Sequence, residues 1–283
     1  MSTPTSVDLP AGVRRTEIRT GRGAFAALAA QPVHGVCERE TALLVPGYTG
    51  SKEDFIAVLD LLAADGRRVF AIDMRGQYQT QPGDYSPESL AADITAVAGT
   101  TGARHLLGHS YGGLVARDAV LDSIAADLFS FTLMSSGPGA LTGPRAAELI
   151  STIHALSGRT LADIWDTVLE PQAIAAGVPA VIREFLRART LATDHNGLLC
   201  MASNLLSAPD RTDELAKLAA LPMLVVYGEN DNTWSPVLQE EMAHRLGASR
   251  VCIPGAVHSP NVEAPATTAS TLNSFWDECE SVR

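Results

Sequence analysis

Positive charge is scarce in this chain of 283 residues. Lysine and arginine together number 21 against 32 aspartates and glutamates, so the formal net charge is −11 at pH 7. The lysines are Lys52 and Lys217, and the arginines are scattered instead of clustered. An acidic protein repels phosphate backbones and anionic lipid headgroups, so we expect no nucleic-acid partner and no binding to a membrane surface.

Long apolar runs are also missing. The longest are much shorter than the ~20 residues that a membrane-spanning helix needs. Residues 1–15 lack the apolar region of a secretory signal. We therefore expect a soluble, cytoplasmic protein that is a monomer or a homodimer. Hydrophobic residues make up 46% and charged residues 19% of the chain, which is typical of a globular protein.

Cysteine is rare, and its spacing carries no metal or redox motif. None of the four cysteines forms a C-x-x-C pair, so we expect free thiols in a reducing compartment at Cys37, Cys200, Cys252 and Cys279. No cluster of histidine, cysteine and carboxylate has ligand spacing. We expect neither a metal nor an organic cofactor.

Short apolar runs alternate with helical patterns along most of the chain. Residues 14–19 and 24–29 are predicted strands joined by a glycine-containing turn. Runs that are apolar on both faces, as buried parallel strands require, occur at 42–45, 69–72, 105–107, 131–134, 223–227 and 251–253. Between them lie amphipathic patterns, one of which begins at Ser86 and Pro87 with a capping signal. This alternation predicts an α/β fold with a mostly parallel sheet covered on both faces.

The alternation is interrupted by a stretch without a good strand candidate. Residues 143–208 instead contain amphipathic helical patterns, one of them preceded by the capping pair Thr160 and Asp163. We interpret residues 143–208 as a helical cap inserted into a core domain formed by residues 1–142 and 209–283. Such an insertion is a candidate lid, although a packed helical subdomain without a gating role fits the pattern as well.

The strongest chemical signal is the segment Gly108-His109-Ser110-Tyr111-Gly112, which matches G-x-S-x-G. A predicted strand precedes it and a helical pattern follows it, which is the context that this motif requires. A sharp strand-to-helix turn would hold Ser110 in a strained conformation with its hydroxyl exposed, and side chains at Gly108 and Gly112 would collide across the turn. The motif therefore predicts a nucleophilic serine at a helix N-terminus, where developing negative charge is stabilised.

From residue 24 to residue 276 the chain resembles the α/β-hydrolase superfamily, whose triad follows the order Ser, acid, His. The resemblance places the acid at Asp231, in a loop similar to the family's G-x-x-D, with Glu229 as the competing carboxylate. It places the base at His258, after the last predicted strand. In this arrangement histidine removes the proton of Ser110 and the carboxylate orients the imidazole.

The same resemblance implies an oxyanion hole. One donor is the backbone N–H of Tyr111, and the other comes from the loop after residues 42–45, where we assign Tyr48. The family usually has His-Gly in this loop, whereas this chain has Pro46-Gly47. A segment similar to the family's D-x-R-G begins at Asp73, and we expect Asp73 and Arg75 to brace loops near the site. The polar residues 77–79 after it either shape the pocket or face solvent.

These residues predict a serine hydrolase, most simply a carboxylesterase that forms an acyl-enzyme on Ser110. A thioesterase, an amidase, a carbon–carbon hydrolase and a cofactor-free peroxidase-like activity remain alternatives. So does a lyase, because residues 47–51 faintly resemble a loop of lyases of menaquinone synthesis. Outside enzymes, a small-molecule receptor on the same fold fits the sequence. The expected partner is a small ester-like molecule, and Trp165 and Trp234 are candidate pocket residues.

Overall fold

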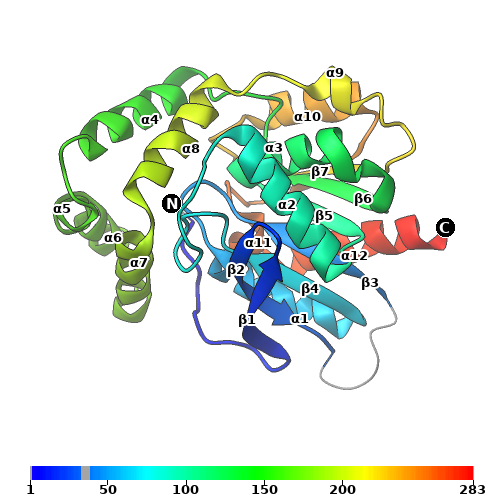
Figure 1. The fold of residues 1–283 in the computed structure, drawn as a ribbon, viewed down its shortest axis with the longest axis horizontal. Coiled ribbons are helices and arrows are strands. Elements are labelled where there is room, and N and C mark those ends of the chain that lie inside the picture. Colours follow the sequence, from blue (N-terminus) through cyan, green and yellow to red (C-terminus); the bar gives the residue numbers. More distant parts are fainter. Residues whose placement is uncertain (1, 33–38, 283) are drawn as a thin grey trace.

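A computed structural model describes residues 2–32 and 39–282, in which a single eight-stranded sheet forms the centre of the molecule (Figure 1). The strand order is β1-β2-β4-β3-β5-β6-β7-β8. Strands β4, β3, β5, β6, β7 and β8 pair in parallel, whereas β2 pairs antiparallel with both β1 and β4. The strands are β1 (Val13–Thr20), β2 (Gly23–Ala30), β3 (Arg39–Val45), β4 (Arg67–Ile72), β5 (His105–His109), β6 (Ser130–Met134), β7 (Met223–Gly228) and β8 (Ser249–Ile253).

Helices cover both faces of the sheet, which confirms the predicted α/β-hydrolase fold class. One apolar core lies between the sheet and a helical layer formed by α2 (Pro87–Thr101), α3 (Tyr111–Ala119) with η2 (Val120–Ile124), and α10 (Pro236–Leu246). The other core lies between the sheet and a layer formed by η1 (Lys52–Phe55), α1 (Ile56–Ala64) and α12 (Pro265–Ser281). The remaining short helices outside the insertion are η3 (Ala125–Asp127), α9 (Thr212–Leu215) and α11 (Pro260–Glu263).

The strand β5 shows why these runs are apolar on both faces. Leu106 points into one core and Leu107 into the other, and both side chains are fully buried. Alternate side chains of a strand point to opposite faces, so a strand covered on both sides has no position for a solvated residue. The predicted helix start at Ser86 is also confirmed, since its hydroxyl accepts a hydrogen bond from the Ser89 N–H and Pro87 occupies the first turn.

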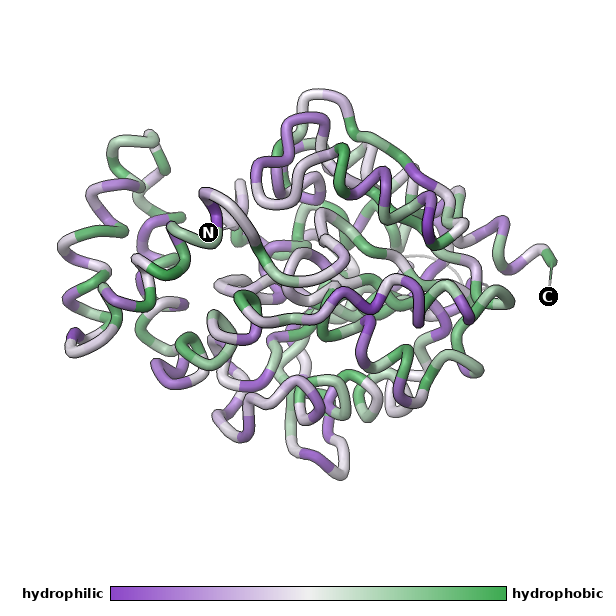
Figure 2. Tube along the Cα trace, turned by 90° about the horizontal axis from the view of Figure 1, so that it is seen from above, coloured by the Kyte–Doolittle hydropathy of each residue, from purple (hydrophilic) through white to green (hydrophobic). Residues whose placement is uncertain are grey.

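Residues 143–207 fold as a run of helices that leaves the sheet on one side. They are α4 (Gly143–Leu156), α5 (Leu161–Ile164), η4 (Trp165–Leu169), α6 (Glu170–Ala175), α7 (Ala180–Ala192) and α8 (His195–Ser207). The predicted capping pair is present, because Thr160 and Asp163 form a reciprocal capping box at the start of α5. Figure 2 shows this helical segment projecting from the sheet-containing body, with the N-terminus at the junction between them.

The predicted free thiols are confirmed at Cys200 and Cys252. Cys279 is buried in α12. Cys37 lies outside the described residues. Within the described ranges, no helix is long and apolar enough to cross a membrane.

A buried polar cluster ties the last helix to the sheet. The guanidinium of Arg67 is inaccessible to solvent and pairs with Glu280 and with Asp277, the latter at 2.9 Å. His105 bonds the same Glu280 through Nε2 at 3.0 Å and Ser130 Oγ through Nδ1 at 2.8 Å. Its ring stacks on Trp276 at 5.4 Å between centroids. Each polar atom of His105 therefore has a partner inside the protein.

This cluster predicts a pH-dependent contribution to stability. Burial, and secondarily the charge of Arg67, lower the pKa of His105 from 6.5 to about 4. Between these two pKa values the unfolded chain binds a proton at His105 and the folded chain does not. The contribution of neutral His105 to the free energy of unfolding is therefore complete above pH 6.5 and is lost as the pH falls toward 4. The unchanged chain should lose unfolding free energy when the pH falls from 7 to 5. In His105→Gln we expect this loss to be smaller by about 2 kcal/mol. Urea unfolding of both chains at the two pH values measures this, and an equal pH dependence would contradict it.

Candidate active site

Ser110 occupies a strained turn between β5 and α3. Its φ of 55° and ψ of −124° lie in a region that non-glycine residues rarely adopt. A Cβ at Gly108 would lie 2.4 Å from the carbonyl oxygen of Gly112, and a Cβ at Gly112 would lie 2.3 Å from the carbonyl oxygen of Pro46. Only glycine fits at these two positions. The turn therefore presents the hydroxyl of Ser110 at the carboxyl end of β5.

Three side chains from distant parts of the sequence meet at this edge of the sheet. His258 Nε2 lies 3.0 Å from Ser110 Oγ, and His258 Nδ1 lies 3.0 Å from Asp231 Oδ1. Asp231 follows β7 and His258 follows β8, so both loops leave the carboxyl ends of parallel strands. The structure thus brings together the three residues that the sequence singled out.

The carboxylate of Asp231 is held by two further donors. Its Oδ1 accepts from the Thr233 N–H at 2.9 Å, and its Oδ2 accepts from Gln239 Nε2 at 2.9 Å. The same amide nitrogen of Gln239 donates to the Trp234 carbonyl at 2.8 Å. Because Gln239 lies in α10 and is inaccessible to solvent, it fixes the loop that carries Asp231. No motif in the sequence marked this glutamine, and its position four residues after the helix cap Ser235 is the only local signal.

Glu229, the competing carboxylate, does not bond His258 and bonds a neighbouring loop instead. Glu229 is exposed, and its Oε2 accepts a hydrogen bond from the Gly255 N–H at 2.9 Å. That bond joins the loop after β7 to the loop after β8. Glu229 therefore connects two loops at this edge of the sheet, and Asp231 is the carboxylate that bonds His258.

His109, the residue before Ser110, also contacts the loop that carries His258. Its Nε2 bonds the backbone carbonyl of His258 at 2.8 Å, and the two rings are 5.2 Å apart. Burial, and secondarily the neighbouring His258, lower the pKa of His109 to about 3. A neutral His109 can donate to the His258 carbonyl without adding a positive charge beside the His258 ring.

The loop after β3 approaches Ser110 closely. A Cβ built on Gly47 would lie 3.1 Å from the Cβ of Ser110. Gln77 is buried, and its Nε2 donates to the carbonyls of Gly47 at 2.8 Å and Tyr48 at 3.0 Å. Its Oε1 accepts from the Met74 N–H at 3.1 Å. Gln77 thus orients the peptide units around Tyr48. Of the two alternatives for residues 77–79, Gln77 therefore contacts a loop of the site and does not face solvent.

Asp73 and Arg75 both fix neighbouring segments, but they bond different elements. Asp73 accepts from the backbone N–H and from Nζ of Lys52, both at 2.8 Å, and so fixes the start of η1. Arg75 pairs with the buried Asp93 of α2 through two bonds of 2.6 Å. Neither side chain is among those that line the cavity at Ser110.

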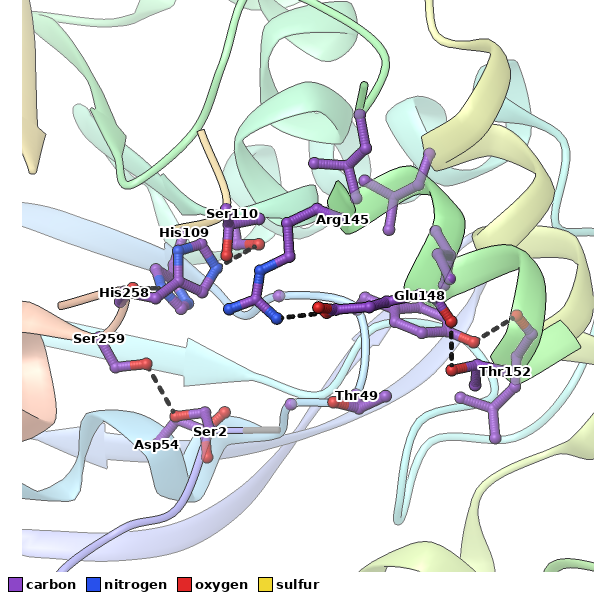
Figure 3. A pocket seen from close by; sticks show the side chains of 18 of the residues that line it. Ser2, Thr49, Asp54, His109, Ser110, Arg145, Glu148, Thr152, His258 and Ser259 are labelled. Carbon is purple, nitrogen blue, oxygen red and sulfur yellow. Dashed lines mark hydrogen bonds and ion pairs between the residues drawn. The ribbon is translucent and has the colours of Figure 1, made fainter. Parts of the chain in front are cut away.

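A cavity of about 460 Å³ opens beside Ser110 and His258. The apolar part of its lining comes largely from the helical segment, with residues Leu149, Leu156, Leu161, Ile164, Leu169, Leu198 and Leu205. The polar part comes from several elements and includes Ser2, Asp54, Ser259 and Glu263, together with Arg145, Glu148 and Thr152 of α4 and Arg189 of α7. Figure 3 shows Ser2, Asp54 and Ser259 on one side of the Ser110–His258 pair, and Glu148 and Thr152 of α4 on another.

The two candidate pocket tryptophans lie in different places. Trp234 lines the cavity, with its ring 6.4 Å from that of His258 and its Nε1 donating to the Gly139 carbonyl at 3.3 Å. Trp165 is fully buried in a small core with Ile182 and Leu186 and is not among the lining residues. Trp165 has the same helical spacing as the lining residues nearby, but it faces α7.

Across residues 2–32 and 39–282, no group of three or more histidines, cysteines and carboxylates is arranged to hold a metal ion.

Comparison with known families agrees with this geometry. Residues 42–271 match the model of the alpha/beta hydrolase family. A Variovorax paradoxus protein named as a carbamate hydrolase, RutD, is 34% identical over 98 residues, which cover 33% of this chain and 37% of that protein. The match therefore spans well under two thirds of the relative.

Solved structures resemble the whole fold. A thermophilic esterase from Thermogutta terrifontis has a TM-score of 0.73 at 24% identity, covering 94% of this chain and 99% of the other. A hydrolase from Pseudomonas aeruginosa has a TM-score of 0.72 at 25% identity, covering 93% and 98%. An enol-lactonase from Burkholderia xenovorans has a TM-score of 0.71 at 19% identity, covering 92% and 99%.

Proposed function

The chain belongs to the alpha/beta hydrolase family, and we propose that it is a serine hydrolase that cleaves carboxylic esters through an acyl-enzyme on Ser110. The observation that carries this proposal is the continuous chain of hydrogen bonds from Ser110 Oγ through His258 to Asp231, with both distances 3.0 Å. A hydroxyl, an imidazole and a carboxylate in this order make a serine nucleophilic at neutral pH.

In the proposed reaction, His258 Nε2 takes the proton of Ser110 as Oγ attacks the ester carbonyl carbon. The carbonyl oxygen becomes an oxyanion, for which we assign the backbone N–H groups of Tyr48 and Tyr111 as donors. Tyr111 begins α3, so its N–H has no partner within the helix. The protonated His258 then gives its proton to the leaving alkoxide. A water molecule, deprotonated by His258, then attacks the acyl-enzyme in the same way and releases the carboxylic acid and Ser110.

We propose that residues 143–208 cap this site, with residues 1–142 and 209–283 as the core domain. The apolar part of the cavity lining consists largely of leucines from α4 and α8, which favours an apolar acyl group there. Arg145 of α4 connects the segment to the core, because its Nε donates to the Asn232 carbonyl at 2.8 Å and its Nη2 donates to Asn232 Oδ1.

The proposal is tested by the reaction of the protein with a fluorophosphonate probe and by its turnover of p-nitrophenyl esters. We expect mass spectrometry to find the phosphonyl group on Ser110 and ester hydrolysis to stop when labelling is complete. A receptor on this fold would show no turnover of any ester, and the proposed function would then be wrong.

The arrangement around Gln77 predicts a loss of catalysis without a loss of binding. A glutamate at this position has no N–H to donate and would set a carboxylate against the carbonyls of Gly47 and Tyr48. Losing one oxyanion donor typically costs ~10²–10³ in kcat, and we expect Gln77→Glu to approach the lower figure with a much smaller change in KM. Steady-state kinetics on a p-nitrophenyl ester measures this. Gln79→Glu, on the exposed side of the same loop, is the matched control, and equal kcat values in both variants would contradict the positioning role.

A further inference from the structure

The first residues of the described chain reach the catalytic cavity. Residues 2–10, here named the N-terminal strap, run to the junction between the helical segment and the sheet (Figure 1). Ser2 is one of the residues that line the cavity, and Pro4 is buried. A segment that the sequence analysis left unassigned therefore forms part of the wall of the proposed active site.

Two side chains from distant parts of the sequence contact the tip of the strap, and one of them is itself fixed by Asp54. Arg189 of α7 is 1% exposed, and its Nη2 donates to the Ser2 carbonyl at 2.7 Å while its Nη1 bonds Asp54 Oδ1 of η1 at 2.8 Å. Ser259, the residue after His258, lies with its Oγ 3.5 Å from that of Ser2 (Figure 3). Ser2 thus belongs to the polar part of the cavity lining, directly beside the catalytic histidine loop.

The middle of the strap is held less firmly than its ends. Val7 packs against the core around Trp165, and Leu9 packs against the core beneath α1 and α12. Between Pro4 and Val7 the side chains of Thr5 and Ser6 are exposed, and a second cavity of about 220 Å³ separates the strap from η1 and α1. Segments with few buried contacts open at a free-energy cost well below that of global unfolding. Removal of residues 2–6 should therefore leave the sheet and the helices folded.

The proposed chemistry decides which part of a substrate would meet the strap. His258 must give its proton to the leaving alcohol, so that alcohol has to lie on the His258 side of Ser110. Ser259 directly follows His258 and contacts Ser2, and both lie next to the Ser110–His258 pair (Figure 3). The leucines of α4 and α8 belong to the apolar part of the lining. The acyl group then fits the apolar part, and the alcohol group points at the strap.

We infer that the N-terminal strap sets the size limit for the alcohol part of the substrate, so that the protein prefers esters of compact alcohols. This inference rests on the proposed function. With the strap closed, the Ser2 backbone fills the space into which a bulky alcohol would extend. With the strap displaced, that space joins the cavity and the second cavity beneath the strap.

The test compares two esters that share an acyl group, ethyl butyrate and 2-naphthyl butyrate. In a variant that lacks residues 2–6, we expect the ratio of kcat/KM for the naphthyl ester over that for the ethyl ester to rise at least tenfold. Ser2→Trp should lower the same ratio, whereas Thr5→Trp, which places the same side chain on the exposed part of the strap, should leave it unchanged. A ratio that stays the same in both the truncated and the Ser2→Trp chains overturns the inference.

A second measurement keeps this test independent of the proposed function. Equilibrium dialysis of intact 2-naphthyl butyrate against Ser110→Ala chains, with and without residues 2–6, reports access to the cavity without catalysis. We expect at least tenfold tighter binding by the truncated chain, and equal binding overturns the role of the strap. If the full chain hydrolyses neither ester, the proposed function fails, while the dialysis result still decides what the strap does.

Discussion

Replacing Ser110 by alanine is expected to lower kcat for a p-nitrophenyl ester by ~10⁴–10⁶-fold, because the nucleophile of the proposed acyl-enzyme is removed. The side chain of Ser110 makes no capping bond to α3, and the bond described for its Oγ is the one with His258. Its backbone N–H bonds the Met134 carbonyl at 2.9 Å, and this bond survives the substitution. The variant should therefore fold normally and bind substrate.

Two comparisons separate this result from a simple folding defect. Ser123→Ala removes an exposed hydroxyl of η2 that contacts Thr95 and is not among the groups that line the cavity, and it should retain full activity. Thermal unfolding of the Ser110→Ala chain should stay close to that of the unchanged chain. Turnover by Ser110→Ala within tenfold of the original rate, in a folded chain, would mean that another group carries out the reaction.

The sequence predicts the fold because the requirement for buried parallel strands is local. A strand such as residues 223–228 needs apolar side chains in both directions, and this need is visible within six positions. Once the strands are known, the loops at their carboxyl ends must share one edge of the sheet, so the positions of Ser110, Asp231 and His258 follow from their places after β5, β7 and β8.

The supporting residues were not predictable in the same way. Gln77, Gln239 and His109 act through hydrogen bonds to backbone or carboxylate groups, and those to Tyr48, Asp231 and His258 span 29, 8 and 149 positions of the sequence. Glutamine and histidine occur equally well on a solvated surface, so no periodic pattern reveals which of them is buried. Trp165 is predicted to line the pocket but packs against α7. An apolar stripe on a helix does not tell whether it faces a cavity or the next helix.

The acid of the proposed triad carries the other large effect: we expect Asp231→Asn to lower kcat by ~10⁴-fold. Oδ1 of Asp231 accepts from both His258 and the Thr233 N–H, and Oδ2 accepts from Gln239. An asparagine has only one oxygen, so one of these donors must face an NH₂ group instead. If that donor is Gln239, its amide can turn and offer Oε1, which has no hydrogen-bond partner among the described residues.

Geometry can thus be preserved in the asparagine chain while the negative charge is lost. The positive His258 that forms as Ser110 attacks then has no counter-charge, and the loss should appear in kcat with little change in KM. Stopped-flow or steady-state hydrolysis of a p-nitrophenyl ester measures the effect. Glu229→Gln removes the other carboxylate of the same loop, which contacts only the Gly255 N–H among the bonds described, and should cost no more than a few-fold. Equal losses in the two variants would show that the negative charge of the loop, and not the position of Asp231 against His258, supports the reaction.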